Sequence, residues 1–63
     1  MVRKYLAILD DGNNYIEFEY FSEYRNNSKM NMGDLKSDYF MRYGRKAYDK
    51  IIWENTKTYL QND

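Results

Sequence analysis

The sequence contains no cysteine and no histidine among its 63 residues. Disulfide bonds are therefore excluded, and the usual zinc-ligand sets are absent because they draw on these two residue types. The commonest nucleophile and base pairs of enzymes also need one of them. The close carboxylate pairs that remain, Asp10 with Asp11 and Glu17 with Glu19, suit a turn and a solvated strand face. We therefore expect no enzyme, no metal and no cofactor.

The chain also lacks proline and long apolar segments. No proline-rich linker divides it, so residues 1–63 form one small domain. No apolar run reaches the length of a membrane span, and the N-terminus lacks the apolar core of a signal peptide, so we expect a cytoplasmic protein that does not contact the membrane. A domain this small buries only about 60% of its unfolded surface. We therefore expect a homodimer to complete its core.

The chain also has no net charge, because its ten basic and ten acidic residues cancel. A general polyanion-binding domain is normally strongly basic, which argues against that class. The distribution is uneven, however. Residues 1–40 contain more acids than bases, and the N-terminal part is tilted negative by Asp10, Asp11, Glu17, Glu19, Glu23, Asp34 and Asp38.

Aromatic residues are abundant, with eight tyrosines, three phenylalanines and one tryptophan. Tyrosine combines a large contact area with a polar tip and is enriched at protein interfaces. A core of this size does not hold so many rings. Some of them are therefore expected at the surface, where they are available to a partner.

The first half of the sequence predicts a β-hairpin. The segment 2–9 is a candidate strand, and DDGNN after it contains residues that tolerate positive φ and close hairpins. The segment YIEFEYF, residues 15–21, alternates with period two. One face then carries Ile16, Phe18 and Tyr20, and the other carries Glu17 and Glu19 beside further rings.

The second half predicts a loop, a helix and a third strand. After a polar loop over 22–31, a helix is expected over 32–43, capped by Asn31 or Ser28, with Asp34 in its first turn and Gly44 as its C-cap. β-Branched and aromatic residues predict a strand over 48–55, followed by a frayed tail over 56–63. The expected fold is α+β, a ββαβ unit with an antiparallel sheet, one helix and exposed sheet edges, dimerising through the sheet or the helix.

Two segments in this order resemble the small dimeric uracil-DNA glycosylase inhibitors of Bacillus phages. DDGNNYIEF is similar to the hairpin of that family, and SDYFMRYGRKAYDKII is similar to the end of its helix. The resemblance spans roughly residues 5–53. Within this range, the stretch around residues 21–31 is an insertion that the family lacks. It implies a dimer with a larger sheet, in which two helices frame an apolar recess.

The resemblance also implies a function and a set of residues. Such an inhibitor occupies the DNA-binding face of uracil-DNA glycosylase, a host DNA-repair enzyme: its acidic groups replace phosphates, and its recess captures the apolar side chain that the enzyme inserts into DNA. Glu17 would be a phosphate mimic, Tyr39 would line the recess and Tyr43 would make a contact at the helix end. Phe40 stands where the family has a glutamate. The candidate partner-binding residues are Glu17, Glu19, Asp38, Tyr39, Phe40 and Tyr43.

A second hypothesis is a small single-strand nucleic-acid-binding or regulatory protein of a phage or mobile element. Such proteins stack bases on aromatic side chains inside a positive groove. From residue 24 onward the sequence interleaves basic residues with tyrosines: Arg25, Lys29, Arg42, Arg45 and Lys46 with Tyr24, Tyr43 and Tyr48. The acids of the hairpin oppose direct nucleic-acid binding, so a protein partner is the first expectation.

Overall fold

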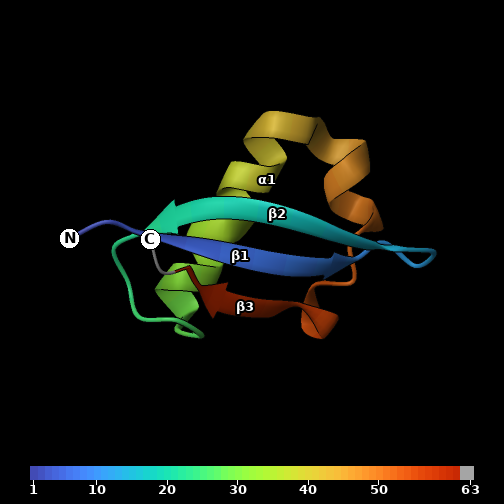
Figure 1. The fold of residues 1–63 in the computed structure, drawn as a ribbon. Coiled ribbons are helices and arrows are strands. Elements are labelled where there is room, and N and C mark those ends of the chain that lie inside the picture. The colour runs from blue at the N-terminus through green and yellow to red at the C-terminus, as the bar shows by residue number, and fades with distance from the viewer. Residues whose placement is uncertain (62–63) are drawn as a thin grey trace.

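The computed structural model describes residues 1–61 and has the element order β1 (Arg3–Asp10), β2 (Tyr15–Ser22), α1 (Lys29–Lys50), η1 (Trp53–Asn55) and β3 (Lys57–Leu60). The three strands form one antiparallel sheet in the order β2-β1-β3, shown in Figure 1. The predicted α+β fold, a ββαβ unit with one helix, is confirmed.

The hairpin forms as its turn chemistry predicts. The Asp11 N–H donates to the Asn14 carbonyl over 3.1 Å, and the Asp11 carboxylate accepts from the Asn13 and Asn14 N–H groups at 2.9 and 2.7 Å. These backbone donors hold the pKa of Asp11 below its usual value. Gly12 adopts φ 91°, which glycine reaches without steric cost. The hairpin register pairs Asp10 with Tyr15 and continues to the Arg3–Ser22 pair.

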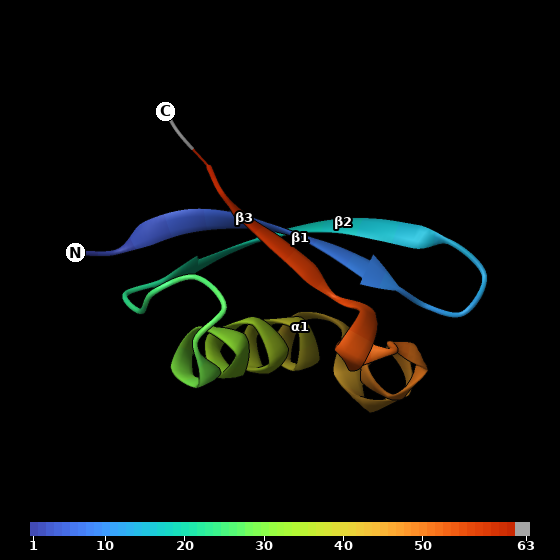
Figure 2. The same cartoon turned by 90° about the horizontal axis from the view of Figure 1, so that it is seen from below.

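The sheet and the helix form two layers. Figure 2 shows α1 under one face of the sheet and the opposite face open. The period-two pattern of β2 follows this division: Phe18 and Tyr20 are buried toward the helix, and Glu17 and Glu19 are exposed on the open face. The core between the layers consists of Tyr5, Ala7, Leu9, Phe18, Tyr20, Leu35, Tyr39 and Ile51.

A buried polar network joins the start of the helix to the sheet. Ser28 is the N-cap, and its hydroxyl accepts from the Asn31 N–H at 3.1 Å. Asn31 is 1% exposed; its Oδ1 accepts from the Tyr20 hydroxyl at 2.6 Å, and its Nδ2 donates to the Tyr24 carbonyl at 3.0 Å. Burial raises the pKa of Tyr20 to about 12. Of the two predicted caps, Ser28 is therefore the N-cap, and Asn31 is a core residue.

The helix begins earlier than predicted, and this changes the role of Asp34. Because α1 starts at Lys29, its first turn contains no acid, and Asp34 lies in the second turn. The Asp34 carboxylate accepts from the Ser22 hydroxyl at 2.7 Å, which ties it to the end of β2. The prediction of a dipole contact in the first turn was wrong, and a hydrogen bond to the sheet takes its place.

The helix also ends later than predicted, because Gly44 kinks it instead of ending it. Gly44 has the expected positive φ, 86°, but the chain returns to helical geometry and continues to Lys50. The kink turns the second helical segment so that the Tyr48 ring meets the Phe40 ring edge-on, with 5.5 Å between centroids. This contact joins the two helical segments across the glycine.

The third strand lies later than the predicted range 48–55. Residues up to Lys50 are helical, Ile51 caps the helix and is buried, and Trp53–Asn55 form a 3-10 turn. The Ile52 N–H donates to the Asp10 carbonyl at 2.8 Å, so this segment closes the end of the sheet. Residues Lys57–Leu60 then pair with β1, so half of the segment 56–63 that was predicted as a frayed tail is the strand; residues 62–63 lie outside the described part.

Within residues 1–61, no helix combines the length and the apolar composition needed to cross a lipid bilayer.

The two glycines of α1 allow a matched test of the kink. A Cβ at Gly33 or at Gly44 meets nothing within 4 Å, so only backbone conformation distinguishes the two sites. We expect Gly44→Ala to lower the free energy of unfolding by about 1 to 3 kcal/mol, because φ 86° with ψ −179° is essentially a glycine conformation. Gly33→Ala should raise it by up to about 1 kcal/mol. Urea denaturation measures both, and equal stability of the two variants would contradict the kink.

Candidate partner-binding surface

Glu17 and Glu19 lie side by side on the exposed face of β2, the strand at one edge of the sheet. Residues i and i+2 of a strand are about 7 Å apart along its axis. Glu19 forms an ion pair with Lys4, with 3.6 Å between Nζ and Oε2. Among the described residues, Glu17 forms no ion pair, so its negative charge is available to a partner.

The two glutamates border an open depression that is also lined by side chains of the helix α1. This depression, here called the edge depression, has a volume of about 350 Å³ and is lined by Leu6, Glu17, Phe18, Glu19, Arg42 and Tyr43. Tyr43 is 57% exposed, and its ring lies 5.9 Å from the Phe18 ring. Three of the predicted site residues, Glu17, Glu19 and Tyr43, are therefore brought together in one place.

Asp38 reaches the same region through an ion pair. Its two carboxylate oxygens accept from Nε and a terminal nitrogen of Arg42 at 3.0 and 3.2 Å. The Arg42 guanidinium lies 4.9 Å from the centre of the Phe18 ring. Asp38 therefore orients Arg42 over the aromatic floor of the edge depression, and its own charge is largely balanced there.

Tyr39 lies in the core beneath the edge depression. It is 5% exposed, and its ring contacts those of Phe18, Tyr43 and Trp53, with centroid distances of 5.1, 4.9 and 5.7 Å. Burial raises the pKa of its hydroxyl above the ordinary tyrosine value. Tyr39 supports the Tyr43 ring from below, and Tyr43 is the more exposed of the two rings.

Phe40 lies on a different surface of the helix. With Lys36, Ser37, Met41, Arg45 and Tyr48 it lines a depression of about 340 Å³ beside the Gly44 kink. Phe40 is 41% exposed and Met41 is 82% exposed. Phe40 thus lies in a different depression from Glu17 and Glu19. This second depression combines the side chains of Phe40, Met41 and Tyr48 with two basic residues, Lys36 and Arg45.

The site prediction missed three residues that line the edge depression, Leu6, Phe18 and Arg42, of which Arg42 is the charged one. It had been considered only as one of several bases for nucleic acid. The available signal was its position four residues after Asp38, since an acid and a base at this spacing pair on a helix surface. Nothing in the sequence showed that this pair would stand over Phe18.

The depressions described above are open, and none encloses a cluster of reactive groups. Within residues 1–61, no three acidic side chains come together as a possible metal-ligand set. The edge depression offers exposed carboxylates and an exposed ring as contact groups.

Comparison of the chain with family models, with curated proteins and with solved structures gave no match. The argument for function accordingly rests on the residues of the edge depression.

Tyr39 and Tyr43 should respond very differently to truncation. We expect Tyr39→Ala to lower the free energy of unfolding by about 3 to 5 kcal/mol, since it leaves a cavity among the three rings that Tyr39 contacts. Tyr43→Ala should cost less than about 1 kcal/mol because most of its ring is already exposed. Thermal unfolding followed by circular dichroism measures both, and similar losses for the two variants would contradict the assignment of Tyr39 to the core.

Proposed function

We propose that this chain is a protein inhibitor, encoded by a phage or mobile element, that binds a host DNA-processing enzyme by DNA mimicry in the cytoplasm of a bacterium. Uracil-DNA glycosylase is the first candidate enzyme. The observation that carries the proposal is the edge depression, where the exposed carboxylates of Glu17 and Glu19 stand beside the exposed ring of Tyr43.

The carboxylates suit the replacement of phosphates. Glu17 and Glu19 are about 7 Å apart along the strand and place two negative charges in a row, as successive phosphates of one DNA strand do. DNA-binding faces carry lysine and arginine, and a negative edge is attracted to them at long range. Because Glu17 has no ion pair among residues 1–61, this attraction does not require an existing pair to break.

The aromatic part of the depression suits an apolar side chain. Tyr43 presents ring surface next to the two carboxylates, and the buried Phe18 ring supports it with an edge contact. An enzyme that inserts an apolar side chain into DNA carries it next to its phosphate-binding residues. A surface that combines carboxylates with rings therefore matches both parts of such a DNA-binding face.

The neutral net charge agrees with local mimicry because the charges are segregated between the layers. The hairpin carries Asp10, Asp11, Glu17 and Glu19 against two bases, Arg3 and Lys4. The helix carries the opposite excess, with six bases, Lys29, Lys36, Arg42, Arg45, Lys46 and Lys50, against three acids, Asp34, Asp38 and Asp49. In the electrostatic field of a basic partner, such a distribution turns the acidic hairpin toward the partner.

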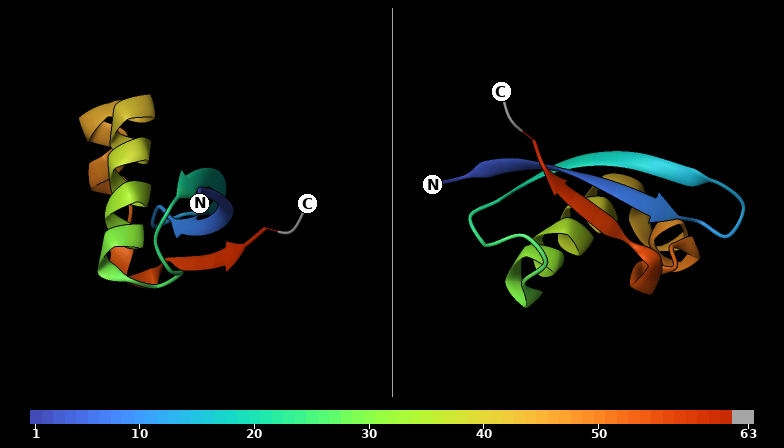
Figure 3. Two further views of the ribbon diagram at one scale, coloured as in Figure 1. Left: turned by 90° about the vertical axis from the view of Figure 1, so that its left-hand side faces the viewer. Right: turned by 60° about the horizontal axis from the view of Figure 1, so that its bottom comes forward.

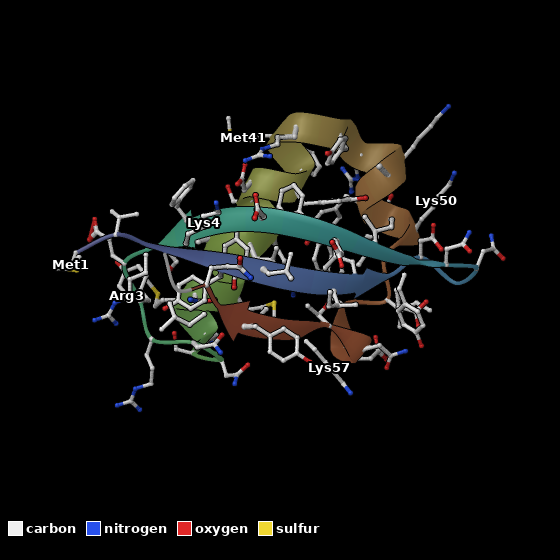
Figure 4. The ribbon with its side chains drawn as sticks, in the orientation of Figure 1. Met1, Arg3, Lys4, Met41, Lys50 and Lys57 are labelled. Atoms are coloured by element: carbon white, nitrogen blue, oxygen red, sulfur yellow. The ribbon has the colours of Figure 1, made fainter. Side chains whose placement is uncertain are left out.

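One observation favours the second candidate, single-strand nucleic-acid binding. The open face of the sheet exposes three rings, Tyr15, Phe21 and Tyr59, and Figure 4 shows Lys57 at its β3 side. Glu17 and Glu19, however, lie between Tyr15 and Phe21 on the same strand face. They would repel the phosphates of a strand stacked on those rings, so this candidate ranks second.

The proposal predicts inhibition of uracil excision by a bacterial uracil-DNA glycosylase, with a defined role for Glu17. We expect Glu17→Gln to slow association with the enzyme about threefold to tenfold and to weaken its salt dependence, since exposed charges act mainly on encounter. Glu54→Gln is the matched control, because Glu54 is exposed on η1, outside the edge depression. Stopped-flow kinetics at several salt concentrations measure both variants.

Complete uracil excision in the presence of excess wild-type protein would overturn the proposed enzyme target. Steeply salt-dependent binding of single-stranded DNA by the wild-type protein would instead support the second candidate.

We also propose that the chain functions as a homodimer, supported by its small core and by exposed apolar residues on both layers. Sedimentation at micromolar concentration should give twice the chain mass of 7.8 kDa. Tyr59→Glu should dissociate a dimer that forms through the open sheet face, and Met41→Glu one that forms through the helix. Their exposed fractions, 51% and 82%, allow both substitutions without unfolding. A monomeric wild-type protein would contradict the proposal.

A further inference from the structure

The outer edge of β2 has unpaired backbone groups along its length. Hydrogen-bonded pairs alternate along an antiparallel ladder, and the bond from the Asp11 N–H to the Asn14 carbonyl sets their phase. Ile16, Phe18, Tyr20 and Ser22 therefore bond to β1. The N–H and C=O groups of Tyr15, Glu17, Glu19 and Phe21 point away from the sheet, and within residues 1–61 no other group bonds to them.

The opposite edge of the sheet is protected. β3 has four residues, and the side-chain amide of Asn26 donates to the Thr58 carbonyl at 3.2 Å. The Thr58 hydroxyl also bonds to the side chains of Asn26 and Asn27. The loop before α1 therefore covers the edge of β3, and the eight-residue β2 is the edge open to another strand.

The helix layer extends beyond β2. In Figure 1 the part of α1 around the Gly44 kink lies past the β2 edge, and the left view of Figure 3 shows the same overhang from the end of the sheet. Figure 4 places Met41 on this overhang. A strand added beside β2 would accordingly lie over the helix surface that carries Arg42 and Tyr43, and it would cover the edge depression.

The side chains of β2 define what such a strand must carry. On the open face its neighbours would be Glu17 and Glu19, and on the helix side they would be Phe18 and Tyr43. Directly opposed side chains in a sheet interact, so opposite charges stabilise the pairing and like charges weaken it. The complementary strand therefore alternates basic residues on one face with apolar residues on the other.

A second copy of this chain does not meet that requirement. Two copies of β2 can pair antiparallel through their outer edges in several registers. The register that pairs the whole strand sets Glu17 opposite the second copy's Glu19. A shift by two residues sets Glu19 opposite the second copy's Glu19. Glutamates on a strand edge are a known protection against such self-pairing. The charge pattern thus selects a different protein.

We propose that β2 is a strand-addition site, which takes an extended segment of the target protein with alternating basic and apolar residues. This inference rests on the proposed function, because it names how the same surface holds its partner. Main-chain hydrogen bonds supply affinity in this mode, and alternate side chains supply specificity.

A synthetic peptide tests the site without the enzyme. The probe is Lys-Val-Lys-Tyr-Lys-Val-Lys with blocked ends, and the matched control replaces each lysine by glutamate. We expect the lysine peptide, at saturation, to slow amide hydrogen exchange of Tyr15, Glu17, Glu19 and Phe21 about tenfold or more, because these N–H groups become bonded. The glutamate peptide should leave them unchanged. Absence of this protection with the lysine peptide overturns the inference.

Two variants separate backbone pairing from charge attraction. Glu17→Thr and Glu17→Pro both remove the carboxylate, and only the second removes the outward N–H. Proline is tolerated at such an edge position because its nitrogen faces solvent. We expect Glu17→Pro to bind the lysine peptide, and to inhibit the enzyme, about tenfold more weakly than Glu17→Thr. Equal behaviour of the two folded variants overturns strand addition.

The same pair of variants distinguishes the other outcomes. If the wild-type protein inhibits the enzyme and the Glu17→Thr and Glu17→Pro variants inhibit it equally, strand addition is overturned and the inhibitor function stays in place. Protection by the lysine peptide without any inhibition supports the strand-addition site and overturns the enzyme target. A wild-type homodimer that Glu17→Pro dissociates and Glu17→Thr does not would assign the edge to a second copy, which overturns the proposal of a different protein.

Discussion

The buried hydrogen bond between Tyr20 and Asn31 sets the position of the helix on the sheet. The Asn31 side chain also donates to the Tyr24 carbonyl, and the Asn31 backbone N–H donates to the Ser28 hydroxyl at the N-cap, so this one residue joins β2, the loop and the first turn of α1. An unpaired amide in this place would cost about 1 to 3 kcal/mol, which favours this placement of the first turn. Leu35 and Tyr39 follow on the same helical face, and the position of Arg42 and Tyr43 at the β2 edge is a consequence.

The sequence was most informative where two local signals agreed. The hairpin combined a turn rich in Asp, Gly and Asn with a period-two strand, and both its ends and its faces were predicted. The third strand was misplaced because Ile51, Ile52 and Trp53 have strand propensity but follow the helix directly. The conformation of residues 51–53 is set by the buried helix end at Ile51 and by the hydrogen bond from the Ile52 N–H to the Asp10 carbonyl. Gly44 was ambiguous for a similar reason, since a positive φ serves a kink as well as an end.

The candidate site was predictable in its charges and less so in its rings. Period two places Glu17 and Glu19 outward whatever the helix does. The rings depend on the drift of 3.6 residues per turn, by which Tyr39 points to the core and Tyr43, one turn later, reaches the rim, while Phe40 lies on another side. Whether an aromatic residue on this side of the helix is buried depends on where the edge of the sheet lies beneath it. That boundary follows from strand order, which a single sequence does not specify.

The two glutamates of β2 also resolve a conflict inherent in the fold. A domain of 63 residues that leaves an eight-residue strand open at its edge risks pairing with its own copies. Carboxylates on the exposed face oppose that pairing, and the same charges attract a basic partner from solution. Apolar residues at these positions would have strengthened self-association, and lysines would have repelled the proposed target. Glutamate at alternate positions is the choice that keeps the edge open and gives it a preferred partner.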